Sequence, residues 1–473
     1  MSSPARWRLR ARLTSETIRR DQPTVPVTDA TRSHDSFPLT DEDRAILAKE
    51  SPTIAGHTCK VLLLGSSLDL RALRASVSRR LVATPTLTRR LGGSPSAPRW
   101  VPDDAFSIEE HIVQSPHRAP LSEEELKATV ASLFAERLDR QRPLWRIDIV
   151  GPLWDGGTAL VWRVHHALAD GATWTKFAAA LLWDLEKGPS PRPGALARVA
   201  AAAEDSQRRH RRSLVGVLRR EFGRAPGLSP FDGRIGSHRR VSFASASLPH
   251  LRAAAKAIDR AATVNDAVLA CVAGGLRRWL GLHDRSVGVR CKVPVSLHRV
   301  GDEVANRDSF FYVDLPVTDP DPAGRLRAIR QETAVRKRRH DAEEVDRLLR
   351  ALGHTSPHLR TMCERLLFDP RRFAINVSTV RGPSEPVSVL GEPVRRVYAI
   401  ADIAERHAVR VTAFSLADQL NFGFCADADL IHDLDRLAAA VAAEADELTG
   451  AAGSPSAAAQ ESGRLGRPPP RRS

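Results

Sequence analysis

Hydrophobic residues in the first half of the chain form strand-like runs separated by helix-like spacing. Three short runs are apolar and rich in β-branched residues, as strands are: residues 58–64, 144–150 and 159–164. Three longer segments carry an apolar side chain every three or four positions, as amphipathic helices do: residues 70–81, 126–138 and 173–185. Ser122 and Glu125 stand where a capping box would begin the second of these helices. The pattern predicts a mixed α/β unit.

The second half repeats this alternation. Its predicted strands are residues 287–294, 310–315 and 373–379. Its predicted helices are residues 268–280, 326–335 and 430–448. Thr263 and Asp266 are placed to cap the first of these helices. A second α/β unit is therefore expected.

Length and composition divide the chain into five parts. At 473 residues it is too long for one ordinary core, and two folded domains are expected. Polar, basic or Pro- and Gly-rich stretches separate them and predict a disordered leader, a linker and a disordered tail. The expected parts are the leader 1–37, an N-terminal domain 38–186, the linker 187–246, a C-terminal domain 247–450 and the tail 451–473.

The net charge of +15 bears on which binding partners are expected. Its excess is concentrated in residues 6–20, 208–224 and the basic end of the chain, and only two tyrosines are available to stack on bases, so no nucleic-acid partner is expected. Acidic partners such as coenzyme A phosphates or an anionic lipid surface fit better. Residues 208–224 read either as a basic amphipathic helix on a membrane or lipid droplet, or as a solvated helix between the domains.

The lengths of the apolar runs and the spacing of the cysteines predict a cytoplasmic protein. Peripheral contact with a membrane or a lipid-droplet surface stays open. The sequence contains no apolar run of eighteen residues, as a membrane span would need, and no visible signal peptide. Its five cysteines are scattered and are expected to be reduced. Without C-x-x-C spacing or an acidic cluster beside the histidines, no metal site is predicted.

The strongest chemical signal is the sequence His165-His166-Ala-Leu-Ala-Asp170-Gly171, between a predicted strand and a predicted helix. Neighbouring side chains on an extended segment point in opposite directions, so one imidazole can face a cavity while the other is held in the protein. Imidazole titrates near neutral pH and suits a general base. The alternative is a pair of ordinary structural histidines.

These seven residues resemble the His-His-x-x-x-Asp-Gly signature shared by acyl-CoA-dependent acyltransferases and peptide-synthetase condensation domains. Further segments narrow the resemblance to the bacterial wax ester synthase/diacylglycerol acyltransferase family over residues 38–450. They include Pro143-Leu144-Trp145, Pro230-Phe231-Asp232-Gly233, Thr263-Val264-Asn265-Asp266 and Val293-Pro294-Val295-Ser296. Two segments depart from the family pattern: Leu39-Thr-Asp-Glu-Asp43 matches its opening only loosely, and Thr379 replaces an asparagine in its Ser-Asn-x-x-Gly-Pro segment.

The resemblance implies an α/β (α+β) fold of two chloramphenicol-acetyltransferase-like domains, joined by a long linker, with a substrate tunnel between them. It implies an O-acyltransferase that uses acyl-CoA as a substrate, with no further cofactor. The acceptor would be a long-chain alcohol or a diacylglycerol, and the product a wax ester or a triacylglycerol. The sequence does not choose between these two products.

The resemblance also assigns roles in the site. His166 would be the general base and His165 would position the loop. Asp170 would be structural, bound to an arginine or to backbone donors, or would orient His166 as in a triad. Gly171 would keep the channel open or adopt a positive φ. Asn265 would bind the oxyanion or the acyl-CoA carbonyl, or only cap its helix, and Ser378 and Thr379 are further candidate donors to the substrate.

Two other functions are compatible with the same sequence motifs. A condensation-type enzyme would take its acyl group from a carrier protein, but this chain has no attached carrier domain. A protein of the same fold could instead bind a lipid surface or nucleic acid without catalysis, which the intact histidine motif argues against.

Overall fold

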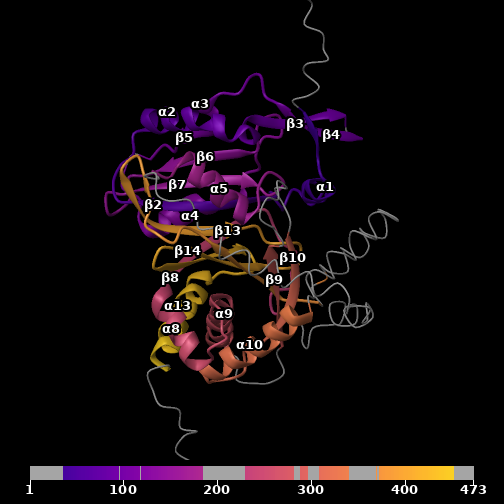
Figure 1. The fold of residues 1–473 in the computed structure, drawn as a ribbon, viewed down its shortest axis with the longest axis vertical. Coiled ribbons are helices and arrows are strands. Elements are labelled where there is room, and N and C mark those ends of the chain that lie inside the picture. The colour runs from indigo at the N-terminus through magenta and orange to yellow at the C-terminus, as the bar shows by residue number, and fades with distance from the viewer. Residues whose placement is uncertain are drawn as a thin grey trace, which may run out of the picture.

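The computed structural model describes residues 36–94, 96–117, 119–184, 229–281, 288–296, 308–339, 369 and 372–451. Within these residues, two six-stranded sheets and one small sheet form the frame of the protein (Figure 1). The first large sheet has the order β12 (Ser388–Val389), β13 (Glu392–Ala401), β2 (His57–Leu64), β7 (Thr158–His165), β6 (Trp145–Val150), β5 (Ile112–Gln114). The second has the order β10 (Asp308–Leu315), β9 (Val289–Ser296), β11 (Ile375–Arg381), β14 (Val409–Leu416), β15 (Gln419–Asp427), β8 (Arg239–Ser247). The small sheet has the order β1 (Phe37–Pro38), β4 (Ala97–Pro102), β3 (Arg89–Ser94).

Helices cover these sheets and divide between the two halves. The first half contains α1 (Asp41–Leu47), α2 (Leu70–Arg80), α3 (Ile108–His111), α4 (Glu123–Ala135), α5 (Gly171–Leu181) and the short 3₁₀ helices η2 (Leu81–Ala83) and η3 (Pro85–Thr88). The second half contains α8 (Leu248–Ile258), α9 (Val264–Leu280), α10 (Pro322–Arg339) and α13 (Leu434–Ala451). In Figure 1 the second group gathers below the second sheet, with α9 among the others.

Strand β7 separates two hydrophobic cores because its side chains alternate between the two faces of the sheet. Leu160, Trp162 and Val164 pack in one core, with α2 and α5. Ala159 and Val161 pack in the other, which also takes in α4, α9 and α13. The second core therefore extends from the first sheet into the second half of the molecule.

The two halves also share a sheet. Strand β13, from the second half of the sequence, pairs antiparallel with β2 in the first sheet, with Ala401 opposite Thr58. Gly423 of β15 lies so close to β13 that a Cβ there would overlap the carbonyl oxygen of Ala399. Beyond β13, Asp402 accepts a hydrogen bond from the Ala55 N–H at 2.9 Å and lies 3.1 Å from Nε of Arg239 at the start of β8. The halves are thus joined through backbone pairing and a buried ion pair.

Most elements expected from the pattern are present, including β2, β6, β7, α4 and the capped helix α9. The capping boxes at Ser122 and Thr263 both form. Strands β13, β14 and β15 were not predicted, although they complete both large sheets.

The expected boundaries differ from the structure at two places. Phe37, assigned to the leader, pairs with Trp100 in the small sheet. Residues 239–246, assigned to the linker, form most of β8 and pair with β15, because Val241 lies in the core and Phe243, Ala244 and Ala246 pack against it. Residues 1–35, the basic segment 208–224 and residues 452–473 lie outside the described residues. The four described cysteines are buried and unpaired.

Candidate active site

The histidine motif lies where β7 ends and α5 begins. β7 is buried along its whole length and ends at His165. The chain then turns, with the Leu168 N–H donating to the His165 carbonyl at 2.9 Å. Asp170 ends the turn by capping α5: its Oδ1 accepts a hydrogen bond from the Thr173 N–H at 2.7 Å. The expected strand, loop and helix are all present.

His165 is buried and held through both ring nitrogens. Its Nδ1 accepts a hydrogen bond from the Ala167 N–H at 3.1 Å. Its Nε2 lies 2.7 Å from Oε1 of Glu50, whose side chain is only 5% exposed. Because Nδ1 acts as an acceptor, the ring proton is on Nε2, the nitrogen that lies beside the carboxylate.

Glu50 was not predicted from the sequence. Its second oxygen, Oε2, lies 3.1 Å from Arg137 and 2.9 Å from Arg140. Burial by itself would raise the pKa of Glu50, but the contacts with His165 and Arg140 outweigh it and lower that pKa to about 2. Glu50 is therefore a carboxylate at neutral pH. It follows α1 in a polar stretch, and nothing in its neighbours along the chain marks it as buried.

His166 is fixed through its backbone, and the residue as a whole is half-buried. Its N–H donates to the Gly56 carbonyl at 3.0 Å. Its Nδ1 is buried without a hydrogen-bond partner in the described part of the chain. Burial and the nearby guanidinium of Arg410 lower the pKa of His166 to about 4, so the imidazole is neutral at pH 7.

The side chain of Asp170 is buried, and it caps α5 by accepting a hydrogen bond from the backbone N–H of Thr173. A triad would need a carboxylate on Nδ1 of His166, and that nitrogen has no partner among the described residues. The geometry favours the structural role over the triad.

Besides Asp170, Lys60 is a buried charged residue beside α5. Its Nζ lies 3.3 Å from Oγ1 of Thr58 and 5.2 Å from the ring centre of Trp174 in α5. Burial lowers the pKa of Lys60 to about 8, and the charge of Asp170 opposes that shift. The signal in the sequence was a lysine within an otherwise apolar predicted strand.

Gly171 is the first residue of α5, and its φ is not positive, so the expectation of a left-handed residue there is wrong. A Cβ at Gly171 would instead come within 2.9 Å of a methyl group of Val380 in β11. The glycine allows close packing of α5 against the end of β11. This contact brings the second half of the chain beside the histidine loop.

Asn265 and Thr379 are paired, whereas Ser378 is not part of that pair. Oγ1 of Thr379 donates to Oδ1 of Asn265 at 2.9 Å. Thr263, and not Asn265, caps α9, so the capping alternative for Asn265 is wrong. Ser378 donates to Thr412 of β14 at 3.1 Å. Because neighbouring strand residues point to opposite faces, Ser378 and Thr379 do not face one ligand together.

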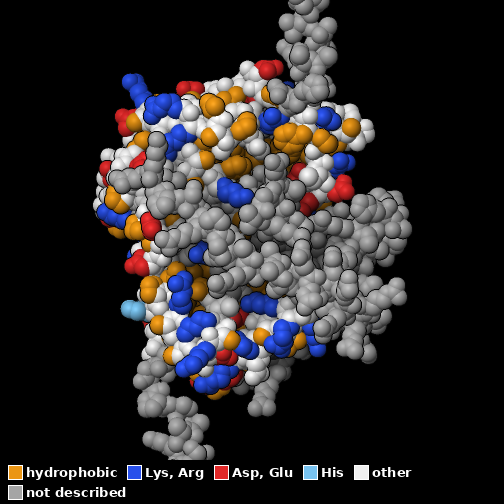
Figure 2. All heavy atoms as spheres, in the orientation of Figure 1, with side chains coloured by type: hydrophobic (Ala, Val, Ile, Leu, Met, Phe, Trp, Pro, Cys, Tyr) orange, Lys and Arg blue, Asp and Glu red, His pale blue; other side chains and the backbone are white. Residues whose placement is uncertain are grey.

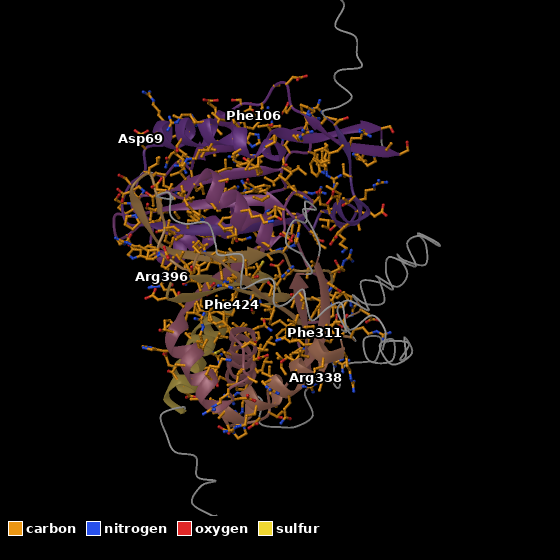
Figure 3. All side chains as sticks on the ribbon, in the orientation of Figure 1. Asp69, Phe106, Phe311, Arg338, Arg396 and Phe424 are labelled. Carbon is orange, nitrogen blue, oxygen red and sulfur yellow. The ribbon has the colours of Figure 1, made fainter. Side chains whose placement is uncertain are left out.

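A surface groove lies elsewhere, on the first half of the molecule. It is lined by residues of α2, η2, η3 and α3, with Val82 86% exposed at its edge and Phe106 inside it. Phe106 is labelled near the upper end of Figure 3, and Figure 2 shows hydrophobic side chains among Lys and Arg over this upper part. The groove includes none of the predicted site residues, and the substrate tunnel stays a prediction.

Two further searches cover only the described residues. No group of three His, Cys, Asp or Glu side chains among them is placed to hold a metal ion. No helix among them has the length and apolar character to cross a membrane.

Known protein structures share this fold. A wax ester synthase/diacylglycerol acyltransferase from Marinobacter aquaeolei VT8 superposes with a TM-score of 0.66 at 23% identity, covering 88% of this chain and all of that one. The first condensation domain of the CDA synthetase superposes with a TM-score of 0.56 at 18% identity, covering 89% and 97%. The expected arrangement of two acyltransferase-like units is confirmed.

Sequence relatives point to the same family. A probable diacylglycerol O-acyltransferase of Mycobacterium tuberculosis H37Rv is 28% identical over 404 residues, which cover 79% of this chain and 87% of the relative. A putative diacylglycerol O-acyltransferase of M. tuberculosis CDC 1551 is 28% identical over 449 residues, covering 87% and 95%. Residues 39–223 match the wax ester synthase/diacylglycerol acyltransferase catalytic domain, and residues 304–449 match the C-terminal domain of that family. The chain belongs to the wax ester synthase/diacylglycerol acyltransferase family and carries its acyltransferase catalytic domain.

Proposed function

We propose that the protein transfers an acyl group from acyl-CoA to the hydroxyl of a long-chain alcohol or a diacylglycerol, with His166 as the general base. The observation that carries this proposal is the state of His166: a neutral imidazole with a buried Nδ1, on a half-buried residue at the start of the loop between β7 and α5. Family membership supplies the reaction class. A starter condensation domain of similar fold, with a TM-score of 0.57, was solved with C8-CoA, which supports a CoA thioester as donor.

The reaction balances without any other reactant. The hydroxyl oxygen attacks the thioester carbonyl carbon and forms the new C–O bond, while His166 takes the hydroxyl proton through Nε2. The tetrahedral intermediate then collapses, the C–S bond breaks, and the proton passes from His166 to the departing CoA thiolate. Positioned general bases contribute roughly 10²–10⁴-fold to such steps.

A pKa of about 4 makes His166 a weak base in the protein without substrate. The negative charge that develops on the carbonyl oxygen would stabilise the imidazolium and raise its proton affinity during the attack. Proton uptake is thereby favoured in the transition state and disfavoured before it, which is the differential binding that catalysis needs.

The other site residues have supporting roles in this proposal. His165 positions the loop, Asp170 caps α5, and Gly171 lets β11 approach the site. Because Thr379 occupies Oδ1 of Asn265, the amide Nδ2 of Asn265 is the group left to donate to the thioester carbonyl or the oxyanion. Ser378 would contact substrate from a separate position.

We also propose that the lipid acceptor is met at a membrane or lipid-droplet surface through residues 208–224. This proposal rests on the sequence of that segment, where arginines interleave with apolar residues.

The test offers the purified full-length chain palmitoyl-CoA with hexadecanol, with dioleoylglycerol, or with neither, and resolves the neutral lipids by chromatography. Formation of palmityl palmitate, or of a triacylglycerol with one palmitoyl and two oleoyl chains, above the no-acceptor control supports the proposal and identifies the acceptor. A parallel reaction supplies the palmitoyl group on a carrier protein. Ester formed only from the carrier-bound donor would overturn acyl-CoA use and favour the condensation-type alternative.

A further inference from the structure

Three chain segments far apart in sequence meet at the carboxylate of Glu50. Its Oε1 lies 2.7 Å from Nε2 of His165, at the end of β7. Its Oε2 lies 3.1 Å from Arg137 and 2.9 Å from Arg140, both after α4. The two oxygens are therefore divided: one serves the histidine and the other serves two half-exposed guanidinium groups, each 48% exposed.

Gly56 shows how closely this arrangement is packed. Its φ is +74°, a conformation that glycine adopts readily. A Cβ there would come within 2.7 Å of both Cγ of Glu50 and Nε2 of His165. The same residue accepts the backbone hydrogen bond of His166 at 3.0 Å. Gly56 thus joins the Glu50–His165 contact to the backbone of the adjacent histidine.

Resting on the proposed function, we propose that Glu50 is a positioning residue of the acyl transfer, which places His166 by holding the Nε2–H of His165. With Nδ1 of His165 bound to the Ala167 N–H, the Glu50 contact leaves the His165 ring one orientation. The backbone of residues 165 to 167 is then fixed, since the His166 N–H is also bound to the Gly56 carbonyl. The ring of His166 is aimed as a consequence.

The two arginines explain why a carboxylate is used. Together they neutralise a charge that is almost fully buried on the histidine side. An amide at this position would have to turn its oxygen either to His165 or to the arginines. The arginines therefore offset the buried charge of Glu50, while its contact with Nε2 is what acts on His165.

The experiment measures kcat and the KM for palmitoyl-CoA at saturating acceptor. In Glu50→Ala, kcat should fall roughly 10–100-fold with KM within about twofold, because misplacement by about 1 Å costs rate and not donor binding. In the double variant Arg137→Ala with Arg140→Ala, kcat should fall several-fold less than in Glu50→Ala, since the carboxylate still reaches His165. Adding Glu50→Gln to this double variant should keep its rate, because the amide oxygen can now face His165.

Glu136→Ala is the matched control. Oε2 of Glu136 lies 3.4 Å from the guanidinium of Arg163. Arg163 stands two residues before His165 on the same face of β7, and Glu136 itself forms no hydrogen bond or ion pair with His165 or His166 in the described part of the chain. A wild-type kcat in Glu50→Ala would overturn the proposal. So would a triple variant as slow as Glu50→Ala, or a Glu136→Ala control as slow as Glu50→Ala, because each would show that the effect does not act through the contact of Glu50 with His165.

A second measurement does not depend on turnover. Nitrogen-15 labelling of the 16 histidines, with His165→Ala to assign the signal, should show a slowly exchanging proton on Nε2 of His165 in the wild type and its loss in Glu50→Ala. A proton on Nδ1 instead would refute the positioning claim. Should the wild type form no ester while the Nε2 proton behaves as expected, the proposed function fails and the link between Glu50 and His165 stands.

Discussion

The rate of acyl transfer should be almost independent of pH between 5.5 and 7.5. Burial and the charge of Arg410 lower the pKa of His166 from 6.5 to about 4. Only the neutral imidazole can accept a proton, so activity is lost as pH falls through the pKa of the folded protein and not through the ordinary value.

The neutral fraction of His166 at pH 5.5 should differ greatly from that of an unperturbed histidine. With a pKa of about 4, roughly 97% of His166 is neutral at pH 5.5, against about 9% for an unperturbed imidazole. The value of kcat/KM at pH 5.5 should therefore be nearly equal to that at pH 7.5. An unperturbed histidine would lower it about tenfold.

The assay quantifies the ester product by chromatography at each pH, with palmitoyl-CoA well below its KM. Unfolding is a separate effect at low pH. Burial holds the pKa of His57 at about 3, so the unfolded chain takes up that proton first and stability falls as pH drops below about 6.5. Enzyme returned from pH 5.5 to pH 7.5 must therefore recover full activity for the comparison to count.

Arg410→Met provides the second arm, because removing that guanidinium should move the acidic limb toward higher pH. A reversible wild-type limb centred near pH 6.5 would refute the account of the His166 environment. A limb that Arg410→Met leaves in place would show that the Arg410 charge does not act on this imidazole.

Two further predictions concern the helix cap and the basic segment. Asp170→Ala should cost about 1 kcal/mol of stability through the lost cap of α5 and lower activity as well, measured by thermal unfolding and ester formation; abolished activity at an unchanged melting temperature would favour the triad. Neutralising four arginines of segment 208–224 should weaken binding to anionic vesicles by up to about a thousandfold at low salt, at about 1 kcal/mol per charge, while leaving turnover of detergent-dispersed substrate near wild type; binding that survives, or that ignores salt, would make the segment only a linker. The four are Arg211, Arg212, Arg219 and Arg220.

The sequence predicted the histidine loop well because its signals are local. The apolar run before His165, the Asp-Gly pair and the helical spacing after it all lie within about thirty residues of one another. Capping and hydrophobic periodicity act over such distances. The same holds for Thr263 and Asp266, which cap α9 as expected.

Partners that meet only through the tertiary fold could not be predicted in this way. Glu50 precedes His165 by more than one hundred residues, and its burial depends on two arginines beyond α4. Strand β13 ends in an apolar run, residues 397–401, but nothing in that run says that it pairs with β2 in the other half. For Gly171 the sequence left two roles open, an open substrate channel or a positive φ; the structure excludes the positive φ and shows a close approach of Val380 from β11, which no local signal indicates.

The most direct test of the central claim compares His166→Ala with His165→Ala in folded protein, by the rate of ester formation from palmitoyl-CoA. Loss of a general base should lower kcat roughly 10²–10⁴-fold in His166→Ala, and loss of a positioning group should lower it less in His165→Ala. The account predicts that order, with the larger loss in His166→Ala. Equal and mild losses in the two variants would contradict it.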